Sequence, residues 1–244
     1  MEVNPDAKGA EPGEDRFRDW MKLTPARLDV GRTGTRPLTR DMLKLRLDHA
    51  EAVDAVYGEV KEETLDEFGL FTVETQYRDK EHYLKAPDSG RVLTPEGART
   101  VSDRCMPSPQ VQIVVSDGLS ARAIDDNLRD VLPALRDSLS ANGLKEGTSF
   151  FVKGGRVGVM DDIGRLLEPE ALVLLIGERP GLVTASSMSA YMCYKPRPGR
   201  KDSDRMVISN IHISGTPPVE AGAHIGTLLR KMIEQKVSGV KLEV

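Results

Sequence analysis

The sequence lacks the features that nucleic-acid-binding and membrane-embedded proteins need. Only 5% of its 244 residues are aromatic, which leaves few rings for stacking on unpaired bases. The net charge is −4, and the lysines and arginines are spread along the chain instead of forming a basic patch. No apolar run approaches the roughly 20 residues that span a bilayer. We therefore expect no nucleic-acid partner and no membrane-spanning segment.

Cysteine is scarce, since Cys105 and Cys193 are the only two. They lie far apart, without a second cysteine or a close histidine at the spacing of a metal site. A disulfide is one alternative, but two scattered cysteines are more typical of reduced thiols inside a cell. The segment Met1–Pro5 is polar and does not resemble a secretory signal. We expect an intracellular protein without a metal site.

The usual catalytic and nucleotide-binding motifs are absent as well. The segment Gly154–Gly158 has the wrong spacing for the G-x-G-x-x-G dinucleotide motif. The chain has no phosphate-binding G-x-x-x-x-G-K-[ST] loop, no H-E-x-x-H zinc motif and no G-x-S-x-G nucleophile elbow. Ser120 follows Asp117 at a strand-to-helix turn, but no histidine is placed to activate it. We interpret Ser120 as a helix N-cap.

The spacing of apolar residues predicts an α/β fold. After about residue 86 the predicted strands alternate with helices, which is typical of a Rossmann-like parallel sheet with helices on both faces. The predicted strands are residues 70–75, 111–115, 150–153, 172–176 and 188–194. The predicted helices are residues 39–56, 62–68, 94–105, 120–142, 160–167 and 216–238, with Pro133 kinking or restarting the fourth.

We expect three parts along the chain. Residues 1–19 are rich in Glu, Asp, Gly and Pro and predict a disordered tail, because they carry too little apolar surface to offset the entropy of ordering. Residues 20–85 predict a small, mainly helical N-terminal domain. Residues 86–244 predict the Rossmann-like domain.

One predicted strand leads directly into charged residues. The segment Leu174–Gly181 passes from an apolar run into Glu178 and Arg179 and is then ended by Pro-Gly. Parallel sheets bind ligands at such strand ends. Asp117 and Ser209 also follow or interrupt apolar runs, so we expect them to share this site. Without a nucleophile or metal set, the site favours binding over catalysis; an ion pair that caps a turn is the alternative.

A loop before the first predicted helix carries Arg27, Arg32 and Arg36, with Gly31 and Gly34 between them. Guanidinium groups in such a loop suit a carboxylate or a phosphate, and a solvated turn is the plainer interpretation. Since the loop lies outside the predicted sheet domain, we favour contact with a partner protein.

Eight segments carry a family resemblance when they are taken in order: Thr24–Arg27, Gly31–Gly34, Thr39–Leu43, Asp48–His49, Ser116–Ser120, Gly177–Gly181, Ile208–Ile211 and Gly215–Ala221. Together they closely resemble the small (light) subunit of ethanolamine ammonia-lyase, from about residue 20 to the C-terminus. Each segment alone is weakly specific, whereas the ordered set is highly specific.

The resemblance implies an adenosylcobalamin-dependent enzyme that converts ethanolamine to acetaldehyde and ammonia by a radical route. It implies a large-subunit partner, a (β/α)8 barrel that carries the substrate and the catalytic residues. The small subunit would cover the cobalamin at the interface through its Rossmann-like domain, in an assembly similar to a trimer of heterodimer pairs. Tails in this family also suggest a bacterial microcompartment, with the cytoplasm as the other location.

The same resemblance implies three cofactor-binding residues, Val157, Glu178 and Val207. At the third position the family usually has cysteine, so valine removes any role for a sulfur atom. A backbone contact would survive there, because valine keeps its N–H and C=O groups. No catalytic residue and no metal ligand is expected in this chain. His212 lies in a segment close to the Asp-x-His-x-x-Gly motif of some cobalamin proteins, but Asn210 replaces the aspartate, and we do not interpret His212 as a cobalt ligand.

Two other functions remain as alternatives. A standalone α/β enzyme would use Asp117, Glu178 and Arg179 on a small anionic or nucleotide substrate. A scaffold protein would join the complex without touching the cofactor. Activity of the chain by itself favours the first alternative, and cobalamin binding that is insensitive to changes at Glu178 and Val157 favours the second.

Overall fold

The computed structural model describes residues 14–24, 28, 30–181 and 184–243, and contacts divide the chain into two units, residues 1–50 and 51–244. In the first unit α1 spans Glu14–Leu23, and the strands β1 (Arg32–Thr33) and β2 (Arg36–Pro37) form an antiparallel hairpin. The helix α2 spans Thr39–Tyr57 and ends in the second unit. Most of the predicted tail, residues 1–13, lies outside the described residues, as does Arg27.

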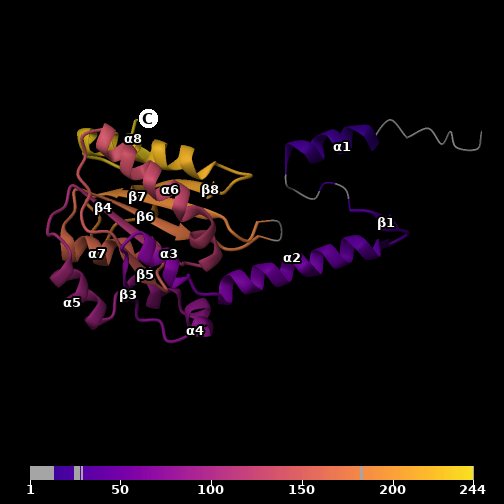
Figure 1. Ribbon diagram of the computed structural model, residues 1–244, viewed down its shortest axis with the longest axis horizontal. Coiled ribbons are helices and arrows are strands. Elements are labelled where there is room, and N and C mark those ends of the chain that lie inside the picture. The colour runs from indigo at the N-terminus through magenta and orange to yellow at the C-terminus, as the bar shows by residue number, and fades with distance from the viewer. Residues whose placement is uncertain (1–13, 25–27, 29, 182–183, 244) are drawn as a thin grey trace, which may run out of the picture. The chain divides into compact units, whose positions relative to one another are not determined.

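The second unit is built on a six-stranded sheet with the order β3-β5-β4-β6-β7-β8 (Figure 1). The strands are β3 (Phe71–Glu74), β4 (Val111–Ser116), β5 (Phe150–Lys153), β6 (Ala171–Gly177), β7 (Met188–Tyr194) and β8 (Met206–Ile211). The first four strands in the order are parallel, and β7 and β8 are antiparallel to their neighbours. The helices are α3 (Glu62–Glu67), α4 (Lys80–Lys85), α5 (Pro95–Arg104), α6 (Ala121–Ala141), α7 (Val159–Leu167) and α8 (Pro218–Gln235), with short 3-10 turns at Pro87–Arg91, Asp202–Asp204 and Gly239–Lys241.

Helices cover both faces of this sheet. Apolar residues of α6 and α8 pack with Ile113, Val115 and Val173 on one face. Residues of α5 and α7 pack with Val114 and Leu174 on the other face. Every residue of β4 and β6 is buried, because these two central strands are covered on both sides. The apolar run that the sequence carries into residue 177 is therefore the centre of the core.

The predicted α/β class is confirmed, but the expectation of a wholly parallel sheet was wrong. The sheet is mixed, since β7 runs back along β6 and β8 runs back along β7. The reason is the length of the connections. Only residues 178–187 and 195–205 join these strands, and a parallel crossover needs a dozen or more residues, usually with a helix.

Several local predictions are confirmed at the level of single atoms. The Thr94 side chain accepts a hydrogen bond from the Gly97 N–H at the start of α5, and the Ser120 side chain accepts one from the Ala123 N–H at the start of α6. Pro133 lies inside α6, which continues to Ala141 without a restart. Both cysteines are free and buried. The strand β3 pairs with β5 and so belongs to the main sheet. The predicted boundary between two domains near residue 85 stays a prediction.

The helices α6 and α8 of the second unit meet at glycines. A Cβ atom added to Gly222 would lie 2.5 Å from the carbonyl oxygen of Val131 and 2.8 Å from Cβ of Ala134. The Ser138 hydroxyl donates a hydrogen bond of 2.6 Å to the Ala223 carbonyl across the same contact. The two helices are therefore held at a separation that only glycine allows at residue 222.

We predict that Gly222→Ala lowers the free energy of unfolding by about 1–3 kcal/mol, because overpacking against the α6 backbone outweighs the gain of about 1 kcal/mol in helix propensity. Urea unfolding of the variant measures this. The matched control is Thr227→Ala, an exposed change on the same helix, which should stay within about 0.5 kcal/mol of the parent. A Gly222→Ala variant more stable than the parent would refute the close packing.

Candidate functional site

A pocket of ≈ 380 Å³ lies at the carboxyl end of β6, and we call it the Glu178 pocket. Val157, Glu178 and Val207 all line it, although they come from the β5–α7 turn, the end of β6 and the edge strand β8. Arg179 and Ser209 line it too. The fold thus brings together the three residues that the family resemblance singles out.

The carboxylate of Glu178 is held by three donors from this chain. The Ser187 hydroxyl donates a hydrogen bond of 2.6 Å to one oxygen, Oε2. The Ser189 hydroxyl and the Asn210 backbone N–H, the latter at 2.9 Å, both donate to Oε1. A carboxylate has about four acceptor positions, so roughly one remains for a ligand. Glu178 is therefore a fixed acceptor at the mouth of the pocket.

A β-bulge aims the Asn210 N–H at Glu178. The pairing of β7 with β8 shifts between Met188 and Ala190, and Asn210 takes a positive φ of 59° opposite this shift. Asparagine tolerates this left-handed conformation better than most residues. The turn is then held by His212, whose ring lies 2.8 Å from the Asn210 side-chain oxygen.

Both ring nitrogens of His212 are engaged within the chain. The Ser214 N–H donates to Nδ1 at 3.2 Å, so Nε2 carries the proton and donates to Asn210. Burial lowers the pKa of His212, with a smaller opposing effect from Glu178. Its role in the structure is to shape the turn after β8. Among the residues described, no cluster of three or more His, Cys, Asp or Glu side chains is arranged to hold a metal ion.

The two valines differ in what they offer to a ligand. Val157 is half-buried, and within the described part of the chain its backbone N–H makes no hydrogen bond. Val207 is 47% exposed on β8, which is the edge strand of the sheet. Edge strands leave backbone groups free on their outer side. Both positions therefore suit contacts through the backbone.

Arg179 does not pair with Glu178. Its side chain is exposed, and the carboxylate of Glu178 is occupied by Ser187, Ser189 and Asn210 instead. In the described residues, therefore, Glu178 and Arg179 do not form the ion pair that was the alternative interpretation of this turn.

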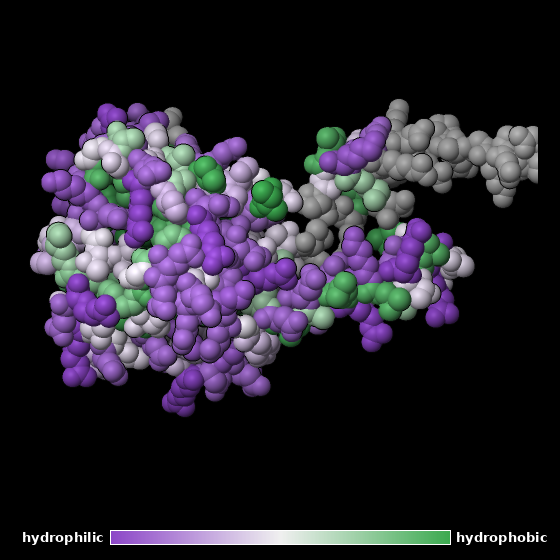
Figure 2. All heavy atoms as spheres, in the orientation of Figure 1, coloured by the Kyte–Doolittle hydropathy of each residue, from purple (hydrophilic) through white to green (hydrophobic). Residues whose placement is uncertain are grey.

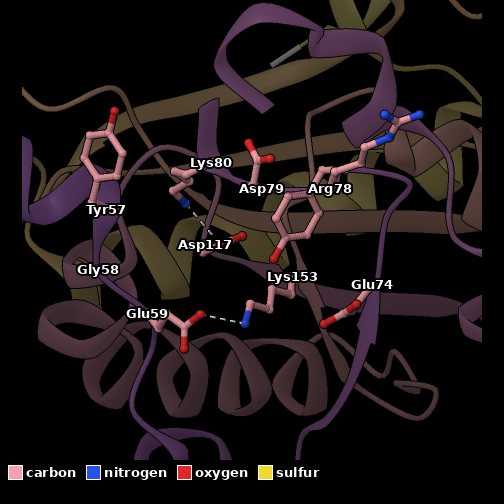
Figure 3. Close-up of a pocket in the computed structure, with 10 residues that line it drawn as sticks. Tyr57, Gly58, Glu59, Glu74, Arg78, Asp79, Lys80, Asp117 and Lys153 are labelled. Carbon is pink, nitrogen blue, oxygen red and sulfur yellow. Dashed lines mark hydrogen bonds and ion pairs between the residues drawn. The ribbon is translucent and has the colours of Figure 1, made fainter. Parts of the chain in front are cut away.

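Asp117 lies in a separate pocket of ≈ 370 Å³, which we call the Asp117 pocket (Figure 3). The prediction that it shares a site with Glu178 was wrong, because Asp117 does not line the Glu178 pocket. The neighbouring Gly118 and Leu119 do line the Glu178 pocket. The Asp117 carboxylate accepts a hydrogen bond of 2.8 Å from the Gly154 N–H and lies 3.5 Å from Nζ of Lys80. Burial raises the pKa of Asp117, and Lys80 offsets part of that rise.

Other charges in the Asp117 pocket are also paired within the chain. Nζ of Lys153 donates a hydrogen bond of 2.7 Å to Glu59 (Figure 3). The trio Asp117, Glu178 and Arg179 that a standalone enzyme would use is therefore divided between two pockets.

The sequence patterns did not identify Ser187, Ser189 or the Asn210 N–H as partners of Glu178. A usable signal exists for the serines, because residues two apart on a strand face the same side of the sheet. No sequence signal marks the bulge that turns Asn210, since it depends on the pairing of β7 with β8.

Comparison with known proteins gives one consistent result. The family model described as ethanolamine ammonia-lyase light chain matches residues 14–243. The chain is similar to the ethanolamine ammonia-lyase small subunit of Fusobacterium nucleatum, with 46% identity over 231 residues that cover 95% of this chain and 78% of that protein. The small subunit of Lachnoclostridium phytofermentans is 48% identical over 230 residues, 94% of this chain and 78% of that protein. That of Clostridium acetobutylicum is 43% identical over 231 residues, 95% of this chain and 96% of that protein.

None of the helices that the structure describes is both long and apolar enough to cross a membrane.

We predict that Asp117→Asn gains stability relative to the parent as the pH rises. Because the folded-state pKa is raised, the native state keeps a proton that the unfolded chain releases, so the parent loses stability as pH increases from about 4 through the folded pKa. Asparagine does not titrate and still accepts from Gly154. Urea unfolding at a series of pH values measures the difference, with the exposed Asp103→Asn as control. A difference that is constant with pH would contradict the burial of this charge.

Proposed function

This chain belongs to the ethanolamine ammonia-lyase light-chain family, and we propose that, as the small subunit of that enzyme, it forms one wall of a cobalamin site completed by the large subunit. The enzyme converts ethanolamine to acetaldehyde and ammonia. The observation that carries the proposal is the convergence of Val157, Glu178 and Val207 in one pocket.

The chemistry of the Glu178 pocket fits the rim of a corrin ring. Cobalamin carries several primary amide side chains there, and each offers N–H donors and a carbonyl acceptor. The remaining acceptor position of Glu178 suits an amide N–H, and the free N–H of Val157 suits an amide oxygen. Val207, which is 47% exposed on the edge strand β8, adds contact surface beside them.

The division of labour follows from what the chain has and lacks. Adenosylcobalamin, when bound, supplies the radical chemistry, and protein supplies grip, orientation and exclusion of water. This chain has a held carboxylate and free backbone groups at the Glu178 pocket, which serve binding and orientation. The substrate and the catalytic residues then belong to the large subunit.

Exposed apolar residues of α2 support a large partner. The apolar residues of this helix that are 40% or more exposed are Met42, Leu43, Leu45, Leu47, Val53 and Tyr57. Figure 2 shows hydrophobic residues in green on the surface of this helix. A helix with so much exposed apolar surface is typical of a protein interface. The exposed Arg32 and Arg36 in the β1–β2 hairpin suit the same partner. The assembly that we propose is a trimer of heterodimer pairs.

The finer assignments of fold and location belong to the same proposal. The parallel strands β4, β5 and β6 with helices on both faces support a Rossmann-like domain over residues 86–244. The small, mainly helical domain proposed before it, residues 20–85, adds the strand β3 to the same sheet. The location proposed is a bacterial microcompartment or the cytoplasm.

We predict that ammonia release from ethanolamine requires both subunits. The chain is purified with and without its large subunit and assayed with adenosylcobalamin. The pair should release ammonia, and either subunit alone should be inactive. Full activity of the large subunit without this chain would contradict the proposal, and activity of this chain alone would favour the standalone enzyme.

We predict that Glu178→Ala weakens retention of cobalamin by the complex about tenfold or more, because a ligand amide loses its acceptor. Equilibrium dialysis of the purified complex measures the affinity, and thermal unfolding measures stability. The matched control is Glu170→Ala, just before β6 at the opposite end of the strand, which should bind cobalamin as the parent does. Equal affinity in the Glu178→Ala complex would favour a scaffold without cofactor contact.

A further inference from the structure

A second hollow adjoins the Glu178 pocket. This hollow, the Asp161 cleft, has a volume of ≈ 900 Å³ and shares Arg156, Val157 and Tyr191 with the Glu178 pocket. Asp161, Asp162 and Arg205 also line it. A ligand that lies over Val157 would therefore contact a residue of both hollows.

Three buried polar atoms that have no partner in the described chain belong to side chains that line the Asp161 cleft: Nε of Arg156, Oδ1 of Asp161 and Nε of Arg205. The Arg205 side chain is only 5% exposed, and its other nitrogens bind Asp161 and Asp202 at 2.7 Å. Leaving a buried donor or acceptor unpaired costs about 1–3 kcal/mol for each group. Such atoms gathered in one cleft indicate a ligand that satisfies them.

Arg156 is fixed in place at the junction of the two hollows. One Nη atom donates a hydrogen bond of 3.0 Å to the Tyr83 carbonyl, and the guanidinium lies 4.0 Å from the centre of the Tyr83 ring. Tyr83 is fully buried and donates from its hydroxyl to the Gly155 carbonyl at 2.7 Å. The guanidinium is thereby preorganised, so little entropy is lost when Nε binds a ligand.

The unpaired atoms include both donors and an acceptor, which restricts the chemistry of the ligand. At the three unpaired atoms a carboxylate or phosphate would face the charge of Asp161, and an ammonium group would face Arg156 and Arg205. The rest of the lining also carries both signs, with Arg91, Arg200 and Lys201 beside Asp162 and Asp202. A neutral group that accepts from arginine and donates to a carboxylate meets neither repulsion. The primary carboxamide is a small neutral group that carries both a carbonyl acceptor and N–H donors.

We propose that the Asp161 cleft binds a primary carboxamide side chain on the corrin rim, whose oxygen accepts from Arg156 or Arg205 and whose NH₂ group donates to Asp161. The inference rests on the proposed cobalamin site and adds the group that this chain recognises beyond Val157. Asp161 lies in the first turn of α7, four residues after Val157, and both residues line the cleft.

The test measures affinity of the complete complex for adenosylcobalamin and for its rim monocarboxylic acids, in which one amide is hydrolysed to a carboxylate. Equilibrium dialysis reads binding without reference to activity. The parent complex should bind one of these acids about tenfold or more weakly than adenosylcobalamin itself. The carboxylate of that acid has no N–H to donate to Asp161 and is repelled by its charge. Asp161→Asn should reduce this preference to below about threefold, since asparagine can donate to the carboxylate.

The control is Asp162→Asn, the adjacent residue in the same cleft. Its Oδ2 accepts from the Leu93 N–H at 3.0 Å and its Oδ1 accepts from Arg165 at 2.8 Å, so both oxygens are engaged within the chain, whereas Oδ1 of Asp161 is not. This variant should keep the preference for the amide. A second variant, Arg156→Lys, keeps the positive charge but lacks Nε. The complex with this variant should bind adenosylcobalamin about fivefold or more weakly than the parent does.

Three outcomes separate the proposals. If Glu178→Ala weakens cobalamin binding while every monocarboxylic acid binds the parent as the amide form does, the cleft assignment is overturned and the cobalamin site stands. If Asp162→Asn also removes the preference, recognition by Asp161 is overturned. If neither Glu178→Ala nor the cleft variants alter binding, both proposals fail. Thermal unfolding of each complex distinguishes lost contacts from misfolding.

Discussion

Direct backbone contact between the turn after β4 and the end of β6 determines how this protein presents its carboxyl edge. The Leu119 N–H donates to the Gly177 carbonyl at 3.0 Å, and a Cβ atom on Gly118 or Gly177 would overlap backbone atoms of the facing segment. Gly118 also needs a φ of 52°, which glycine adopts without strain. The contact closes the gap between the two strands. It places Asp117 on one side and Glu178 on the other, and hence produces two hollows with different chemistry.

Glu178 illustrates how a charged residue serves binding without serving proton transfer. Donors from β7 and β8 converge on its carboxylate, and the Asn210 N–H reaches it only because a bulge turns the backbone of β8. The carboxylate therefore has a fixed orientation and little remaining acceptor capacity. The hydroxyls of Ser187 and Ser189 donate to it, and no histidine stands among the described residues that line the pocket. A subunit that orients a reactive cofactor for another subunit needs this kind of group and not a catalytic set.

The sequence predicted what depends on local pattern and left open what depends on pairing. The all-apolar run of β6 identified a strand buried on both faces, and Glu178 at its end followed directly. Short connections exclude parallel crossovers after β6, yet the alternation of elements earlier in the chain favoured a parallel sheet. Asp117 and Glu178 follow adjacent parallel strands, so only the packing of Gly118 on Gly177 shows that they are separated. The Glu178 partners depend on β8, whose register no local pattern sets.

The pairing of buried polar atoms distinguishes a hollow that stabilises the fold from one that awaits a ligand. In the Asp117 pocket, Lys80 pairs with Asp117 and Lys153 pairs with Glu59, so the charges are largely satisfied by the chain. In the Asp161 cleft, by contrast, lie three of the six side-chain atoms that are buried and unpaired within the described residues. Folding alone gives no reason to gather them there, because each lowers stability. Their position beside Val157 does give a reason under the proposal above, since a carboxamide in the cleft would pair Asp161 and one of the two arginines.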